Sequence, residues 1–168
     1  MKNVSKRHNI PFVFIVGLFF LIKPALAENN QETTRFVSLR STEVNMRVGP
    51  GTEYPIEWIY VRQNLPVEVI GEFGIWRKIR DMEGTEGWIH QTMASKNRTI
   101  AIVNEDALMH RADSSSSKSI ALLKVGVIAQ VKRCRQNWCQ VKVNKMKGWI
   151  QAHHVWGLHS GEKVSFKS

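Results

Sequence analysis

The chain has 168 residues, six of them Trp and two Cys, and a formal net charge of +10 at pH 7. This length allows one ordinary domain or two small ones. Beyond the first 27 residues no segment has the apolar spacing of a long helix, and no apolar run could cross a membrane, which excludes a helical bundle and a membrane-spanning bundle.

Residues 1–27 have the pattern of a secretory signal peptide. Three basic residues lie among the first nine, the apolar run Ile10–Ile22 follows, and a small-x-small ending closes the segment. A retained membrane anchor is the alternative, but a spanning helix needs about 20 apolar residues. We predict cleavage between Ala27 and Glu28 and a periplasmic or secreted protein of net charge +6, from 20 basic and 14 acidic residues.

Two copies of one unit of about 60 residues follow the leader. Val44–His90 aligns with Ala107–Gln151, and Gly87-Trp88-Ile89 falls on Gly148-Trp149-Ile150 at an offset that drifts only from 63 to 61. The sequence therefore predicts two domains, at residues 36–95 and 99–157, and a tail at 158–168.

Each unit consists of short alternating runs separated by turn residues. Ile56, Trp58 and Tyr60 share one predicted strand face. Asn64 aligns near Gly126, and both residue types tolerate positive φ, which predicts a tight turn there. Short strands with almost no helix predict an all-β chain of two small barrels.

Three segments of the first unit carry a resemblance to a known family. Asn45-Met46-Arg47-Val48-Gly49-Pro50-Gly51, then Trp76-Arg77-Lys78-Ile79, then Glu83–Ile89 resemble the bacterial SH3-like (SH3b) pattern. The second unit keeps the later blocks but has Leu108–Asp113 in place of the first. The resemblance implies tandem SH3-like β-barrels and leaves function open, since this fold serves many partners.

The repeated Gly-Trp-Ile has two interpretations. In an SH3-like barrel it implies a late strand whose Trp packs near the barrel seam. A partly exposed Trp88 or Trp149 could instead line a ligand groove. We favour a structural role for this motif and keep Trp88 as a candidate ligand contact.

Cys134 and Cys139 predict a disulfide, as an even cysteine count does in an exported protein. Their counterparts in the first unit are Glu72 and Arg77, an opposite-charge pair, which indicates two positions facing each other across a hairpin. Strict alternation places the two cysteines on opposite faces, so the pairing requires a β-bulge. A redox-active pair is the alternative, although its usual spacing has two intervening residues.

An enzymatic role is not expected. A nucleophilic Cys with His153 or His154 would make a hydrolase, but such enzymes carry a separate catalytic domain, and the two barrels leave only 28–35 and 158–168 unassigned. We expect no cofactor. We also expect no metal at His153, His154 or His159, because two of these are adjacent and the sequence places no carboxylate nearby to orient either ring.

Charge is uneven between the units. Residues 36–98 have eight basic and eight acidic side chains, whereas residues 99–157 have nine and three. The second unit is predicted to carry a basic face suited to anionic cell-wall groups or lipid headgroups; its solubilising role is the alternative, and export argues against nucleic acid. This predicted face consists of Lys132, Arg133, Arg135, Lys142, Lys145 and Lys147.

Aromatic residues of the first unit are the candidate ligand contacts, by stacking on a glycan or a stem peptide. The sequence lacks the Ala-Leu-Tyr-Asp-Tyr-type stretch of eukaryotic SH3 domains, so proline-peptide binding does not carry over. We predict a non-catalytic binder of cell-wall peptidoglycan or its stem peptides, or alternatively an envelope protein–protein adaptor, of undetermined oligomeric state and with no membrane span after cleavage. The candidate contacts are Tyr54, Trp58, Tyr60, Trp76 and Trp88.

Overall fold

A computed structural model describes residues 34–164 of the chain. The predicted leader and its cleavage point, Ala27–Glu28, lie outside the described residues. Those residues form fourteen β-strands and two short 3-10 turns, which confirms the all-β class. None of the helical turns within them is long or apolar enough to span a bilayer.

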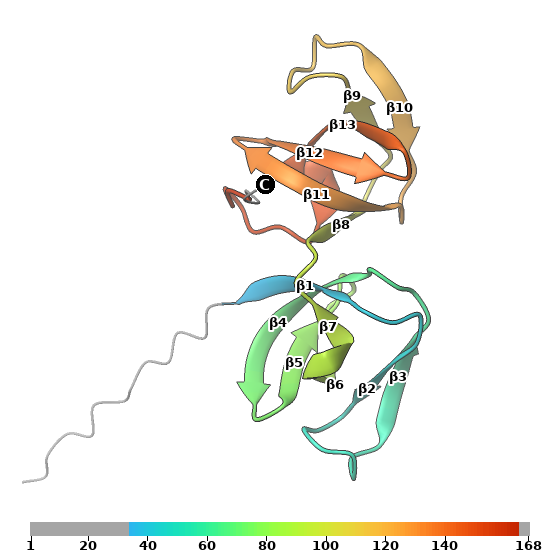
Figure 1. The fold of residues 1–168 in the computed structure, drawn as a ribbon, viewed down its shortest axis with the longest axis vertical. Coiled ribbons are helices and arrows are strands. Elements are labelled where there is room, and N and C mark those ends of the chain that lie inside the picture. Colours follow the sequence, from blue (N-terminus) through green and yellow to red (C-terminus); the bar gives the residue numbers. More distant parts are fainter. Residues whose placement is uncertain (1–33, 165–168) are drawn as a thin grey trace, which may run out of the picture. The chain divides into compact units, whose positions relative to one another are not determined.

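The first seven strands form one sheet, called here the first barrel (Figure 1). Its strand order is β3-β2-β6-β5-β4-β1-β7, and every pairing is antiparallel. A 3-10 turn, η1 (Gln91–Met93), leads into the last strand. The strands are β1 (Arg35–Leu39), β2 (Val44–Arg47), β3 (Ile56–Tyr60), β4 (Pro66–Phe73), β5 (Trp76–Arg80), β6 (Glu86–His90) and β7 (Ala94–Ser95).

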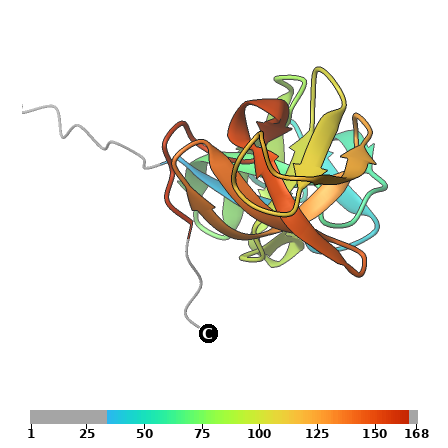
Figure 2. The same ribbon diagram turned by 90° about the horizontal axis from the view of Figure 1, so that it is seen from above.

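The next seven strands repeat this plan in the second barrel. Their order, β10-β9-β13-β12-β11-β8-β14, is that of the first barrel with each strand number raised by seven. Seen from above, the strands of this barrel curl around a common interior (Figure 2). The elements are β8 (Thr99–Ile102), β9 (Ala107–His110), β10 (Ser119–Leu123), β11 (Ile128–Arg135), β12 (Trp138–Val143), β13 (Met146–Gln151), η2 (Ala152–His154) and β14 (Val155–Trp156).

Each barrel encloses its own apolar core, built from alternate residues of its strands. In the first, Met46, Ile79 and Ile89 are completely buried. In the second, Met109 and Ile150 occupy the corresponding positions. Because alternate residues of a strand point to opposite faces, the neighbours of these core residues lie on the outer surface.

Each of the three residues of Gly-Trp-Ile has the same place in both barrels. Ile89 and Ile150 enter the core, and the preceding Trp lies on the outer face of the strand. A Cβ on Gly87 would come within 2.7 Å of Met46 Cγ, and a Cβ on Gly148 within 2.5 Å of Met109 Cγ. Only glycine therefore lets β6 and β13 approach the neighbouring strand, so this motif is architecture.

The Asn-x-Arg-x-Gly-Pro segment shapes the loop between β2 and β3. The Arg47 guanidinium donates to the carbonyl oxygens of Thr52 at 3.1 Å and Tyr54 at 2.6 Å. A Cβ on Gly49 would collide with the Tyr54 ring, 2.4 Å away. The hydrogen bonds of Arg47 thus hold the loop closed, and Gly49 leaves room for the Tyr54 ring. These two contacts explain the arginine and the glycine of the segment.

The predicted tight turns are confirmed. Asn64 has φ 65° and Gly126 has φ 85°, the left-handed region in which glycine and asparagine are favoured. Asn64 N–H donates to the Leu39 carbonyl at 2.9 Å, and Gly126 N–H donates to the Ile102 carbonyl at 2.8 Å. The two barrels therefore share even this backbone hydrogen bond.

Cys134 and Cys139 form the predicted disulfide. They are directly paired across the β11–β12 hairpin, and the register shifts between Val131 and Arg133, which is the bulge that the pairing requires. Both cysteines of the chain are used in this bond.

Residues 158–164, part of the expected tail, pack against the second barrel. Val164 is buried in its core, and the Cys134 N–H donates to the Val164 carbonyl at 2.9 Å. Arg98 binds Glu162 from the start of the barrel through hydrogen bonds of 2.5 and 3.0 Å. In addition to its seven strands, the second barrel therefore has a C-terminal segment, residues 158–164, that packs beside its disulfide hairpin.

Candidate binding surfaces

The outer surface of β11, β12 and β13 brings the predicted basic residues together. These strands are adjacent (Figure 1), and Arg133, Gln140, Trp149 and His110 follow one another across four strands in direct register. Alternation places Lys142 and Lys147 on the same surface, opposite each other. We call this the cationic face, formed by Arg133, Arg135, Lys142, Lys147 and Trp149.

Trp149 is covered by two arginines. The guanidinium carbons of Arg133 and Arg135 each lie 5.0 Å from the Trp149 ring centroid, and the indole is only 4% exposed. Asp113 holds Arg135 from the β9–β10 loop, with a nitrogen–oxygen distance of 2.6 Å. Such cation–π contacts are worth about 0.5–1 kcal/mol each at exposed sites, and they gather two guanidinium groups over one ring.

Two of the predicted basic residues lie at the margin of this surface. Lys132 is the extra residue of the β11 bulge, and Lys145 lies in the β12–β13 turn. With the cationic face, they bring six basic side chains to β11, β12 and β13, of which Arg135 is paired with Asp113. This concentration of one sign of charge attracts anions over several ångströms.

The first barrel lacks this arrangement. The positions equivalent to Arg133 and Arg135 are Gly71 and Phe73, which pair with Lys78 and Trp76. Trp88 corresponds to Trp149, lies directly opposite Lys78 and Arg47, and is half-buried. The stacked arginines are thus a specific property of the second barrel.

The five aromatic residues proposed as ligand contacts divide into exposed and enclosed rings. Trp58 is 55% exposed and Tyr54 40% exposed. Trp76 is buried, edge-on to His90 at a centroid distance of 5.6 Å. The Tyr60 hydroxyl donates to Asp81 Oδ2 at 2.9 Å, and its burial together with this bond raises the pKa of Tyr60 above its ordinary value.

Trp58 and Tyr54 belong to a larger exposed apolar surface that the sequence pattern did not predict. Strand β3, the outermost strand of its sheet, is exposed on both faces except at Tyr60. Alternation of apolar residues predicts one buried face, whereas Ile56 and Trp58 on one face and Ile59 on the other are all exposed. The exposed large apolar residues of the β2–β3 hairpin and the residue that follows it are Val48, Tyr54, Ile56, Trp58, Ile59 and Val61.

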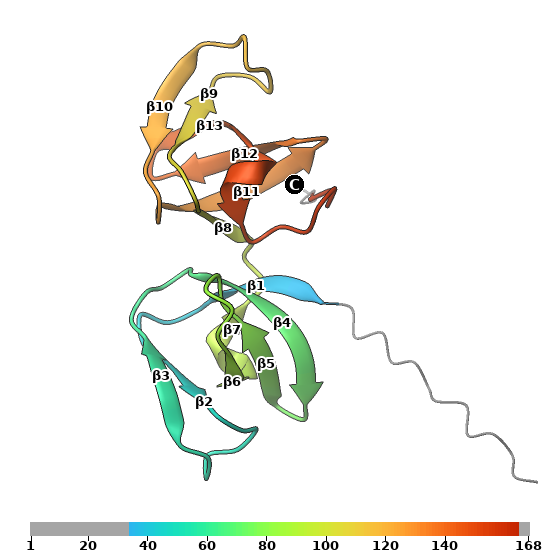
Figure 3. The same cartoon turned by 180° about the vertical axis from the view of Figure 1, so that it is seen from behind.

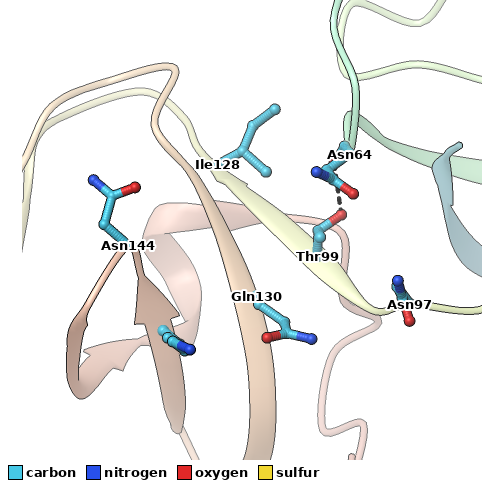
Figure 4. A pocket seen from close by; sticks show the side chains of 7 residues that line it. Asn64, Asn97, Thr99, Ile128, Gln130 and Asn144 are labelled. Atoms are coloured by element: carbon cyan, nitrogen blue, oxygen red, sulfur yellow. Dashed lines mark hydrogen bonds between the residues drawn. The ribbon is translucent and has the colours of Figure 1, made fainter. Parts of the chain in front are cut away.

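A pocket of about 380 Å³ lies next to the cationic face and shares Lys142 with it. Its lining is rich in side-chain amides (Figure 4), and the Thr99 hydroxyl donates to the Asn64 carbonyl at 2.8 Å. Amides and hydroxyls of this kind suit a polar, hydroxyl-bearing ligand. The lining residues are Asn64, Asn97, Thr99, Ile128, Gln130, Lys142 and Asn144.

The family model described as "Bacterial SH3 domain" matches residues 40–96 and again residues 103–157. The chain belongs to the bacterial SH3 domain family. The resemblance drawn from the Asn-x-Arg-x-Gly-Pro, Trp-x-x-Ile and Gly-x-x-Gly-Trp-Ile segments is thereby confirmed, including the duplication.

The chain is also similar to a protein that is named as an amidase. It is 27% identical over 137 residues to "Putative N-acetylmuramoyl-L-alanine amidase YrvJ" of Bacillus subtilis (strain 168), over 71% of this chain and 26% of that protein. The chain therefore spans about a quarter of that relative's length.

Among solved structures, the chain matches NlpC2 from Trichomonas vaginalis at 11% identity and a TM-score of 0.34, over 74% of this chain and 48% of that one. It matches an NlpC/P60 family protein from Bacillus cereus ATCC 10987 at 12% identity and a TM-score of 0.33, over 79% and 59%.

The histidines of the second SH3 barrel have a neighbour that the sequence did not indicate. Glu105, 49 residues before His154 in the chain, lies with its carboxylate oxygen 3.4 Å from His154 Nδ1. The premise that no carboxylate lies near these histidines is therefore wrong. A contact between two loops so far apart in sequence leaves no local pattern by which it could be found.

Proposed function

We propose that this protein is an exported, non-catalytic module that binds cell-wall peptidoglycan through the cationic face of its second SH3 barrel. The observation that carries the proposal is the stacking of Arg133 and Arg135 on Trp149. Two guanidinium groups beside Lys142 and Lys147 match a polymer that presents carboxylates on its stem peptides. Membership of the bacterial SH3 domain family and the similarity to a protein named as an amidase both favour a cell-wall ligand.

The adjoining amide-rich pocket completes this interpretation. The pocket contains Gln130 and Lys142, which alternation places on the outer side of β11 and β12. Arginine forms bidentate bonds to carboxylates, and amide side chains pair with sugar hydroxyl groups. The proposed ligand thus lies with its carboxylates on the cationic face and its glycan toward the pocket.

The non-catalytic part of the proposal rests on the cysteines. Both are in the disulfide, so neither is available as the thiolate that a cysteine peptidase requires. Export rests on the leader pattern at residues 1–27.

Co-sedimentation of the purified protein with isolated peptidoglycan tests the proposal. We expect retention that falls between low salt and about 0.15 M salt, because exposed charges are screened over about 8 Å there. Arg133→Gln/Arg135→Gln should lose at least about tenfold in affinity. The matched control is Arg111→Gln/Lys118→Gln, which removes the same charge from exposed positions of the same barrel and should retain most binding.

Equal losses in both variants would reduce the interaction to net charge, and retention unchanged in the first variant would refute the cationic face as the site. Release of soluble wall fragments by the purified protein would refute the non-catalytic assignment.

A protein–protein adaptor is the second candidate, favoured by the exposed apolar β2–β3 hairpin. Trp58, Ile59 and Val61 are each more than half exposed, and an outermost strand offers unpaired backbone groups to another chain. Crosslinking in cells would then capture one defined partner, and Trp58→Glu would abolish capture without changing retention on peptidoglycan.

A further inference from the structure

Two histidines and one glutamate meet at one end of the second barrel. His153 and His154 belong to η2, the 3-10 turn between β13 and β14 (Figure 3). Glu105 lies in the loop between β8 and β9. One potential ligand atom from each residue lies within 4.8 Å of the other two. The two imidazole centroids are 4.0 Å apart.

The backbone holds the two loops together independently of these side chains. The Val103 N–H donates to the His154 carbonyl at 2.9 Å, and the Glu105 N–H donates to the Val103 carbonyl at 2.7 Å. The second bond closes a three-residue turn centred on Asn104, whose φ of 64° is in the left-handed range. The three side chains are thus brought together by backbone that is already fixed.

His154 has an unsatisfied nitrogen that faces the carboxylate. Its Nδ1 is buried and has no hydrogen-bond partner among the described residues, although Glu105 Oε1 lies 3.4 Å away. In the neutral tautomer protonated at Nε2, the Nδ1 lone pair and the carboxylate oxygen are both electron donors, so a cation between them satisfies both. Ligands at about 2.0–2.1 Å from a tetrahedral ion lie about 3.4 Å apart.

The first barrel shows that the fold itself does not require these residues. Its Arg40 N–H donates to the Met93 carbonyl at 2.8 Å, which repeats the bond between Val103 and His154. At the offsets of the repeat, Glu105, His153 and His154 correspond to Thr42, Thr92 and Met93. The same backbone framework therefore carries three ligand-type side chains in one barrel and none of them in the other.

We propose that Glu105, His153 and His154 form a binding site for a divalent first-row transition ion, with zinc as the ion that fits its two imidazoles and one carboxylate. Imidazole and carboxylate are established ligands of this ion class. Glu105 is 70% exposed in its side chain, so it can close on an ion that enters from solvent, and water completes the coordination. The site shares no residue with the cationic face and does not depend on peptidoglycan binding.

Titration calorimetry with zinc chloride tests the site on protein purified without a histidine tag and stripped with EDTA. We expect one zinc per chain, and a dissociation constant raised at least about tenfold by Glu105→Gln and by His153→Gln. The matched control is His159→Gln, which removes a partly exposed imidazole outside the cluster and should leave zinc binding unchanged.

Thermal unfolding gives a second readout, because a ligand that binds only the folded state raises the unfolding midpoint. Zinc should raise the midpoint of the unaltered protein and of His159→Gln, and should leave that of Glu105→Gln where it is without metal. Glu105 is exposed, so its substitution should not prevent folding. No saturable zinc binding, or binding by Glu105→Gln and His153→Gln as tight as that of the unaltered protein, would overturn the proposal.

Discussion

Glu72 lies directly opposite Arg77 across the β4–β5 hairpin, at the position where the second barrel has its disulfide. The register of β4 shifts between Val69 and Gly71, as that of β11 shifts between Val131 and Arg133. Glu72 also contacts Arg77 as an ion pair, with a nitrogen–oxygen distance of 3.4 Å. One bulged hairpin thus carries a surface ion pair in one copy and a covalent bond in the other.

Removing the disulfide should destabilise the second barrel. A loop closed over six residues contributes about 2 kcal/mol by the loop-entropy relation, and the two buried sulfurs add apolar packing. We expect Cys134→Ala/Cys139→Ala to lose about 2 kcal/mol in the free energy of unfolding, measured by urea titration. A reducing agent should lower the stability of the unaltered protein and leave that of the variant unchanged.

The converse change should stabilise the first barrel. Glu72→Cys/Arg77→Cys places two cysteines in the register that bonds Cys134 to Cys139, so we expect a disulfide to form in air. The gain is about 1–2 kcal/mol, since the lost surface ion pairs are worth about 0–1 kcal/mol against about 2 kcal/mol for the loop. Mass spectrometry under non-reducing conditions should detect two disulfides per chain, and one disulfide with two free thiols would contradict the equivalence of the hairpins.

Trp76 and Trp58 should respond differently to truncation. Trp76 is buried, and loss of a buried tryptophan costs about 3–5 kcal/mol, so Trp76→Ala should unfold at much lower urea. Trp58 is more than half exposed, and Trp58→Ala should cost about 1 kcal/mol or less. Trp58→Ala is therefore the usable probe of ligand contact in this barrel, and equal destabilisation by both changes would contradict the difference in burial.

The glycines of the two Gly-Trp-Ile segments should not tolerate alanine. A Cβ on Gly87 would meet the Arg47 carbonyl oxygen at 2.9 Å, and one on Gly148 the His110 carbonyl oxygen at 2.8 Å. Backbone cannot move aside as a flexible side chain does, so we expect each change to cost about 1–3 kcal/mol. Gly74→Ala is a comparison at a glycine with no heavy atom within 4 Å of the added Cβ, where strain arises only from its positive φ.

The repeat made most of the fold predictable from sequence. Gly-Trp-Ile, Trp-x-x-Ile and the aligned turns are local patterns, and each is explained by a local contact such as Arg47 with the Tyr54 carbonyl. The disulfide was also within reach, because Glu72 and Arg77 marked the same two positions in the other copy. Comparison of the two copies thus supported the pairing that the cysteine count already favoured.

The binding surfaces were less accessible to sequence analysis because they depend on which strand lies beside which. The basic residues are close together in sequence, and their clustering was expected, but the stacking of Arg133 and Arg135 on Trp149 depends on the bulge in β11. The exposure of both faces of β3 is not indicated by its alternating apolar residues. Glu105 reaches His154 only because β8 and β14 are adjacent.

Stability of the second barrel should depend on pH through Glu162. Burial would raise the pKa of this carboxyl, but hydrogen bonds from Arg98 and from the His159 N–H outweigh it, and the net effect lowers the pKa. A carboxyl with a lowered folded-state pKa stabilises the fold above its unfolded-state pKa, about 4.3, and this contribution is lost as the pH falls through the folded-state value. The protein should therefore lose part of its stability below about pH 4.3.

Glu162→Gln isolates this contribution. At pH 7 we expect the variant to be about 1–3 kcal/mol less stable than the unaltered protein, because a largely buried arginine loses a charged acceptor. The difference should shrink as the pH falls below 4, since protonation of Glu162 removes the same charge. Urea titrations at pH 7, 5 and 3 measure this difference in the free energy of unfolding. The control is Glu43→Gln, a change at an exposed residue, which should match the unaltered protein at each pH. A difference that persists undiminished at pH 3 would mean that Glu162 acts through packing of residues 158–164 on the barrel, and its charge would have no part in stability.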